Sequence, residues 1–180
     1  MKTYIALFRG INVGGNNILP MKELAAVLEK IGLRNVKTYI QSGNAIMSSG
    51  ETDPQKLSAI ISGAILKSHG FAPQVLLWTT EEMEQAIAEN PFAEAESSPK
   101  SLHFYFLLAS PQHPDLEQLQ TLKKDSERFL LKEHVFYLYA PEGIGRSKLA
   151  AKVEKCLGVP TTARNWNTVN KIMMLSRKAV

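Results

Sequence analysis

An arginine that closes an apolar run, followed by a loop rich in glycine and asparagine, is the place in this sequence best suited to chemistry. Residues 3–20 read TYIALFRGINVGGNNILP, and three glycines and three asparagines follow Arg9 within eight positions. Glycines let a backbone approach a ligand closely, and successive backbone N–H groups can form a concave anion site. The sequence therefore predicts an anion site at Arg9, Asn12, Gly14 and Gly15.

This loop matches neither of the familiar phosphate-binding motifs. A P-loop places a lysine and a hydroxyl residue directly after its last glycine, and a dinucleotide-binding loop requires G-x-G-x-x-G. Gly10, Gly14 and Gly15 satisfy neither spacing. The alternative interpretation is a long connection between a strand and a helix, in which Asn and Gly satisfy turn geometry.

A polar turn at residues 41–44, with the sequence QSGN, separates two apolar runs. Its Asn44 is a further candidate for ligand binding through neutral hydrogen bonds, while ordinary turn chemistry is the alternative. Ser42 is not a credible nucleophile, because the sequence offers it no base and no strand-to-helix elbow. No catalytic residue is predicted here.

Two basic clusters lie in the second half of the chain. Arg146, Ser147 and Lys148 stand where we expect a helix to begin, and the N–H groups of a helix N-terminus attract anions. The alternative is a serine-capped helix with solvated cations.

The second cluster is Arg164, Asn165 and Trp166. An arginine supplies a planar fork for phosphate or carboxylate, and a tryptophan offers a stacking surface. The alternative is that Asn165 caps the last helix and Trp166 anchors that helix in the core.

The remaining reactive residue types form no recognisable catalytic or metal site. The histidines stand apart at positions 69, 103, 113 and 134, and Cys156 is the single cysteine. None of these spacings resembles a metal-ligand motif. We therefore predict no metal and no cofactor, and the sequence leaves open whether the protein is an enzyme.

Composition places the chain among globular proteins of ordinary type. It has 180 residues, of which 44% are hydrophobic and 21% charged. No apolar run approaches the length of about 18 residues needed to cross a membrane, so no membrane partner is expected. A single cysteine suits a reducing compartment, and we expect a cytoplasmic protein.

The positive charge gathers toward the C-terminus. The net charge is +4, and residues 143–180 hold eight basic residues against one acidic residue. A basic segment of this kind can attract nucleic acid or another anionic partner. A solvated helix face is the alternative interpretation.

The first half of the chain follows one recognisable order of elements. Alternating and β-branched runs predict strands, and apolar residues at helical spacing predict helices that end at Gly32 and Gly70. The strands are expected at residues 3–8, 36–40, 45–47 and 74–78, and the helices at 20–31 and 54–69. The order β-α-β-β-α-β is that of the ferredoxin-like split motif.

The second half repeats this order after a short acidic helix that ends at Glu89. A segment with two prolines, residues 91–100, is expected to link a domain of residues 1–90 to a domain of residues 101–180. Further strands are expected at residues 102–108, 128–131, 135–139 and 158–164, and helices at 114–124, 147–157 and 167–177. The predicted fold class is α+β, with two ferredoxin-like units in one compact chain.

Three segments at their proper spacing resemble a known family. FRGINVGG at residues 8–15, TYIQSGN at 38–44 and TTARNWNTV at 161–169 are together similar to the bacterial family catalogued as domain of unknown function 1697. The resemblance implies an α+β fold of ferredoxin-like units and implies no particular activity. Family members often carry a lysine after the double glycine, where this chain has Asn16.

These features favour a non-catalytic protein that binds an anionic ligand through its arginines and the Gly/Asn loop. The partner would be an anionic small molecule, such as a phosphate compound or nucleotide, or a nucleic acid. Two alternatives remain open: a metal-independent enzyme acting on a phosphorylated or acidic metabolite, and a structural or protein-interaction module. The sequence does not predict an oligomeric state.

Overall fold

The computed structural model describes residues 1–179. The chain divides into two compact units. Unit 1 comprises Met1–Gln85 together with the described residues from Lys171 onward, and unit 2 comprises Ala86–Asn170. The predicted boundary lay instead at residues 91–100, with the whole C-terminal helix in the second domain. Each unit is described by itself below.

Unit 1 is built on a four-stranded antiparallel sheet, sheet 1, with the order β2-β3-β1-β4. The central strand β1 alternates between two buried sets of side chains, as a strand covered on both faces must. The strands are β1 (Lys2–Arg9), β2 (Arg34–Tyr39), β3 (Asn44–Ser49) and β4 (Gln74–Thr79).

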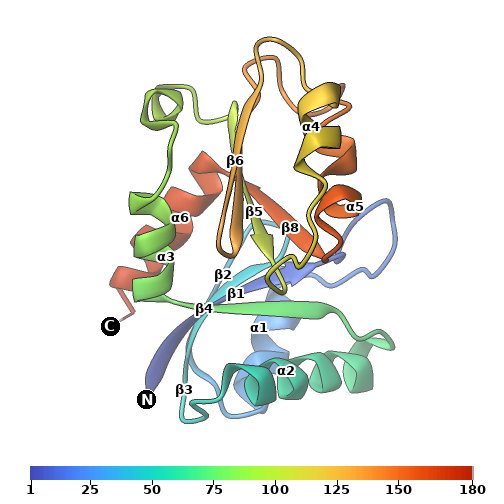
Figure 1. Ribbon diagram of the computed structural model, residues 1–180. Helices are drawn as coiled ribbons and strands as arrows, with labels where there is room; N and C mark the ends of the chain where they lie inside the picture. The colour runs from blue at the N-terminus through green and yellow to red at the C-terminus, as the bar shows by residue number, and fades with distance from the viewer. Residues whose placement is uncertain (180) are drawn as a thin grey trace. The chain divides into compact units, whose positions relative to one another are not determined.

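Two helices, α1 (Met21–Lys30) and α2 (Pro54–His69), cover one face of sheet 1 and lie side by side (Figure 1). In α2 the buried residues Leu57, Ile61 and Ile65 recur every four positions, so they form one apolar stripe. This stripe packs with Tyr4, Phe8 and other residues of sheet 1 in a single core cluster.

The helix ends of unit 1 follow local sequence rules. Asp53 caps α2, because its Oδ1 accepts from the backbone N–H groups of Gln55 and Lys56. Thr79 and Glu82 form a reciprocal capping box at the start of α3 (Thr80–Ala88), with distances of 3.1 and 2.7 Å. The start of α2 at Pro54 agrees with the sequence prediction.

Unit 2 is built on a second four-stranded antiparallel sheet, sheet 2, with the order β6-β7-β5-β8. The strands are β5 (Leu102–Leu107), β6 (Arg128–Lys132), β7 (Val135–Tyr139) and β8 (Thr161–Asn165). Successive side chains of a strand point to opposite faces, so Tyr105 and Leu107 join a core cluster with α4 and α5, while Phe104 and Phe106 face the other side. Tyr137 meets Phe104 edge to face on that other side.

The helices of unit 2 are shorter. The segment α4 (Leu116–Leu122) is capped by Asp115 and packs beside α5 (Val153–Leu157) (Figure 1). The sequence predicted a helix over residues 147–157, and this is wrong for residues 147–152. Residues 150–152 instead form the 3₁₀ helix η2 (Ala150–Lys152). The backbone N–H of Ser147 donates to the oxygen of Ile144, and that of Lys152 donates to the oxygen of Leu149. Bonds between residues three positions apart are those of a 3₁₀ helix or a tight turn and not of an α-helix.

The segment expected to be a linker is folded onto sheet 2. It contains the 3₁₀ helix η1 (Ala93–Ser97), with Phe92 and Ala95 buried. The guanidinium of Arg128 lies 5.1 Å from the Phe92 ring centre and 5.0 Å from that of Tyr139, and it pairs with the carboxylate of Glu94. These contacts explain why the segment belongs to unit 2 although its composition resembles that of a loop.

Both units therefore have the β-α-β-β-α-β order and the antiparallel sheet of the predicted α+β, ferredoxin-like fold, and the fold prediction is confirmed. The last helix, α6 (Trp166–Arg177), follows β8 as expected. Within residues 1–179, no helix combines the length and the apolar character that crossing a membrane requires.

Candidate functional site

The register of sheet 1 brings several predicted site residues to one edge. Strand β1 ends at Arg9, which pairs with Gln74 at the start of β4, and β3 begins at Asn44 beside Leu7. Arg9 is half-buried as a residue, and its Nη1 donates to the side-chain oxygen of Gln74 at 3.2 Å in an exposed hydrogen bond. We call Arg9, residues 10–19 and residues 40–44 the Arg9 edge.

The loop after Arg9 is a small hairpin. The backbone N–H of Asn12 donates to the oxygen of Asn17 at 3.1 Å, and that of Asn16 donates to the oxygen of Val13 at 2.9 Å. Gly14 and Gly15, with φ of 57° and 78°, form the two-residue tip. Two successive left-handed residues define a type I′ turn, which explains the double glycine. The hairpin lies in the segment that joins β1 to α1 in Figure 1.

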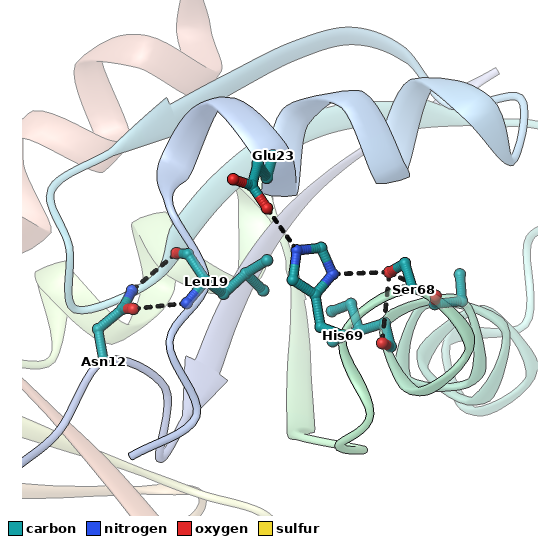
Figure 2. Close-up of polar contacts among 7 residues, drawn as sticks. Asn12, Leu19, Glu23, Ser68 and His69 are labelled. Atoms are coloured by element: carbon teal, nitrogen blue, oxygen red, sulfur yellow. Dashed lines mark hydrogen bonds and ion pairs between the residues drawn. The ribbon is translucent and has the colours of Figure 1, made fainter. Parts of the chain in front are cut away.

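The side chain of Asn12 fixes this hairpin to its surroundings (Figure 2). Its Oδ1 accepts from the backbone N–H of Leu19 at 2.7 Å, and its Nδ2 donates to the oxygens of Leu19 and Gln41, both at 2.9 Å. Asn17 adds a bond from its Nδ2 to the oxygen of Gly10 at 2.9 Å. Both asparagines have positive φ, which Asn tolerates better than most residues.

The turn between β2 and β3 packs against the base of the hairpin. The backbone N–H of Phe8 donates to the oxygen of Gly43 at 2.9 Å, and a Cβ on Gly43 would lie 2.5 Å from Ile11 Cδ1. Asn44 is fully buried, and its Nδ2 donates to the oxygen of Tyr39 at 2.9 Å. Asn44 therefore holds the turn, and it does so at the same edge as Arg9.

In unit 2, residues 143–148 form an exposed turn region. Arg146 and Lys148 are exposed, whereas Ser147 is buried and its Oγ accepts from the backbone N–H of Ala150 at 3.0 Å. The expected helix N-terminus does not lie here, because α5 begins at Val153 and spans five residues. The electrostatic reason for predicting anion binding at this position is therefore removed.

Arg164, Asn165 and Trp166 lie where β8 meets α6. Arg164 is 6% exposed and donates to Thr162 Oγ1 at 2.8 Å and to the oxygen of Ala163 at 2.9 Å. Burial lowers the pKa of its guanidinium to about 10. The Oδ1 of Asn165 accepts from the backbone N–H of Thr168 at 3.0 Å and so caps α6.

Trp166 is a core residue of unit 2. Its side chain is buried, and its ring centre lies 5.7 Å from that of Phe104. The eleven predicted site residues thus occupy three places. Arg9, Asn12, Gly14, Gly15 and Asn44 share the Arg9 edge of unit 1, whereas the exposed turn at residues 146–148 and the β8–α6 junction belong to unit 2.

The structure also reveals a polar chain that the sequence did not predict. Glu23 Oε2 lies 2.7 Å from His69 Nε2, and His69 Nδ1 lies 2.7 Å from Ser68 Oγ (Figure 2). Glu23 lies in the first turn of α1 and His69 is the last residue of α2. The two are 46 positions apart in the sequence, so no local motif could indicate the pair. The contact forms because α1 and α2 pack side by side on one face of sheet 1.

A serine, a histidine and a carboxylate in a chain suggest acyl transfer, but the position of this chain disfavours it. Ser68 lies in the last turn of α2, and the partial negative charge at a helix C-terminus opposes an oxyanion and favours an imidazolium. Ser68 Oγ also donates to the backbone oxygen of Ala64 at 2.9 Å. The three residues therefore join α1 to α2.

The helix-covered face of sheet 2 holds two buried polar atoms without a hydrogen-bond partner among the described residues. They are His103 Nδ1 and Glu127 Oε1. Burial lowers the pKa of His103, and burial together with the nearby Glu127 carboxylate raises the pKa of Tyr105 to about 12. No group of three or more His, Cys, Asp or Glu in residues 1–179 is placed to hold a metal ion.

Comparison with known proteins agrees with this architecture. The family model described as Protein of unknown function (DUF1697) matches residues 1–137, and the chain belongs to this family. Among solved structures, the chain is similar to the conserved bacterial protein SP0830 from Streptococcus pneumoniae. The two are 26% identical with a TM-score of 0.69, and the match covers 97% of this chain and 98% of that one. No curated protein matches the chain.

Proposed function

We propose that this protein binds a small anionic ligand at the Arg9 edge. The observation that carries the proposal is the fixed shape of the exposed hairpin beside Arg9. Gly10, Asn12, Gly14, Gly15 and Asn17 all have positive φ within eight residues. Left-handed backbone at non-glycine residues is unfavourable, and such conformations concentrate at binding sites.

The hydrogen bonds of Asn12 and Asn17 support the proposal, because they hold this loop in one conformation before a ligand arrives. A loop that is ordered in advance loses less conformational entropy on binding. The half-buried Arg9 supplies the positive charge, and its planar guanidinium suits a phosphate or a carboxylate. Because the Nδ2 groups of Asn12 and Asn17 already donate within the loop, backbone N–H groups of the glycine-rich hairpin are the further donors that we propose.

The charge at this edge favours a small ligand over nucleic acid. Arg9 is the single charged residue within residues 9–19 and 40–44. Nucleic-acid affinity comes mainly from several phosphate contacts at once, which one arginine cannot supply. The proposed ligand therefore carries few negative charges.

Thermal unfolding with inorganic phosphate tests the proposal. At a phosphate concentration about ten times Kd, ligand binding contributes roughly 1.4 kcal/mol, which corresponds to a rise of about 3–6 °C in Tm. We expect this rise in the wild type and its loss in Arg9→Ala. Sodium chloride at equal ionic strength separates specific binding from screening.

Arg34→Ala is the matched control. Arg34 is also an arginine of sheet 1, but it is exposed and pairs with Ser48 at the opposite end of the sheet. It should keep the full response to phosphate. An equal rise of Tm in Arg9→Ala and in the wild type would refute the proposal.

A further inference from the structure

The Arg9 edge exposes aliphatic side chains as well as polar groups. Val13 is 63% exposed, Ile18 57% and Ile40 44%. Each is the chain neighbour of a residue in the hydrogen-bonded cluster formed by Asn12, Leu19 and Gln41. Because these bonds join the hairpin to the turn at residues 40–44, the backbone positions of the three aliphatic residues are held at one edge of sheet 1.

Ile40 is the most informative of the three. Its φ is 49°, a conformation in which a β-branched side chain crowds its own backbone. The turn at this position requires a left-handed residue, and the backbone N–H of Gly43 closes it on the oxygen of Ile40 at 3.2 Å. Glycine or asparagine would occupy the position with less strain. An isoleucine here bears that strain and still leaves much of its side chain in water, so folding does not account for the residue type.

We propose that the ligand of the Arg9 edge is an aliphatic monoanion, with a carboxylate or phosphate head and a hydrocarbon tail. This inference rests on the proposed function and specifies its ligand. Arg9 and the hairpin bind the head, and the tail lies over Val13, Ile18 and Ile40. Arg9 is the single charged residue within residues 9–19 and 40–44, which favours a ligand of low charge. The exposed aliphatic side chains give the tail an apolar surface that removes part of it from water.

A series of unbranched carboxylates tests the inference. Acetate, butyrate, hexanoate and octanoate share one head group and differ only in tail length. We expect affinity to rise about twofold for each added methylene, because the tail is half-buried at an open edge, and so to rise about 16-fold over the four methylenes from butyrate to octanoate. When octanoate is added at concentrations at which it does not form micelles, the amide chemical shifts of residues 10–19 and 40–44 should change in NMR spectra.

Ile40→Asn separates binding from folding. Asparagine suits the left-handed conformation, so this variant should be at least as stable as the wild type. It should lose most of the gain in affinity with tail length. Ile60→Asn is the matched control, since Ile60 is also an isoleucine, is 47% exposed and lies in the first half of α2, and this variant should bind the series as the wild type does.

The outcomes separate the two proposals. If acetate and octanoate bind equally, or if Ile40→Asn keeps the full gain with tail length, the inference of an aliphatic ligand is overturned. Phosphate binding that depends on Arg9 would then leave the proposed function intact. If phosphate and all four carboxylates fail to bind the wild type, both proposals are overturned.

Discussion

The side-chain amide of Asn12 bonds both backbone polar groups of Leu19, much as the backbone of a neighbouring strand would. It accepts from the Leu19 N–H at 2.7 Å and donates to the Leu19 oxygen at 2.9 Å. Leu19 itself is fully buried, one residue before Pro20 and two before α1. These two bonds therefore fix the hairpin of the Arg9 edge to the residues that directly precede α1.

Replacing Asn12 by glycine should detach the hairpin from α1. Glycine keeps the φ of 53° without strain, so the loss comes from the side-chain bonds to Leu19 and Gln41 alone. We expect the free energy of unfolding to fall by about 1–3 kcal/mol, because the partly buried backbone groups of Leu19 lose their partner. Urea unfolding measures this change, and hydrogen exchange should accelerate at the Leu19 amide.

Asn16→Gly is the control for Asn12→Gly. Asn16 is an exposed residue of the same hairpin, and it closes the tip through its backbone N–H. A change within about 0.5 kcal/mol is expected, as for other exposed surface positions. Equal losses in the two variants would show that the Asn12 side chain does not hold the hairpin.

Gly43→Ala should be far more harmful than Gly70→Ala. Both glycines have a left-handed φ, 84° and 79°, so both variants suffer about 1–2 kcal/mol of backbone strain. A Cβ on Gly43 would also collide with Ile11 and with Phe8 Cβ at 2.8 Å, whereas a Cβ on Gly70 meets nothing within 4 Å. We expect an additional loss of about 1–3 kcal/mol for Gly43→Ala, measured by urea unfolding. Equal losses of unfolding free energy in the two variants would show that the turn at residues 40–44 can shift and avoid the collision with Ile11.

Glu23 and His69 should be coupled energetically. Their side chains meet at 2.7 Å and join α1 to α2, with Glu23 largely exposed and His69 mostly covered. A double-mutant cycle of Glu23→Gln and His69→Gln should give a coupling of about 0.5–1 kcal/mol at pH 6, decreasing in high salt. A coupling energy of zero at low salt would show that the contact between Glu23 and His69 does not stabilise the packing of α1 on α2.

His103 should make the stability of the protein depend on pH. Burial lowers its pKa below the ordinary value of 6.5, so between these two values the unfolded chain binds a proton that the folded chain does not. The free energy of unfolding should therefore decrease as the pH falls below about 6.5. Urea unfolding at pH 7.5 and 5.5 should show a smaller decrease for His103→Gln than for the wild type.

His113→Gln serves as the control for this pH dependence. His113 is exposed, and its replacement should leave the difference between the two pH values as in the wild type. If His103→Gln keeps the full decrease as well, carboxylates elsewhere account for it.

Much of the fold followed from sequence because local signals and packing agree. Gly70 ends α2 in the left-handed conformation, and Asp53 and Pro54 begin it, so the boundaries were readable. The failure at residues 147–152 has a physical cause. Ser147 does act as a cap, but it closes a single tight turn before the chain continues as a 3₁₀ helix.

The candidate site was only partly readable. Arg9 and the double glycine lie within residues 9–15, so the sequence alone indicated that they would lie at the same edge of the sheet. The bonds that Asn12 makes to Gln41 and the contact of Glu23 with His69 join residues 29 and 46 positions apart, and only the folded sheet brings them together. The burial of Arg164 was also hidden, because a cation in a short strand gives no sign of which face it occupies.

Unit 1 is assembled from two separate stretches of the chain, while unit 2 is one uninterrupted stretch. During synthesis, residues 1–85 leave the ribosome long before the segment from Lys171 that completes them. One bond in that completion is the ion pair between Glu84 and Arg177 at 2.9 Å. Unit 2 is therefore contiguous in the nascent chain, whereas the contacts that the segment from Lys171 adds to unit 1 form only after that segment has been made. Removal of the segment from Lys171 should consequently take contacts away from unit 1, although this segment directly follows unit 2 in the sequence.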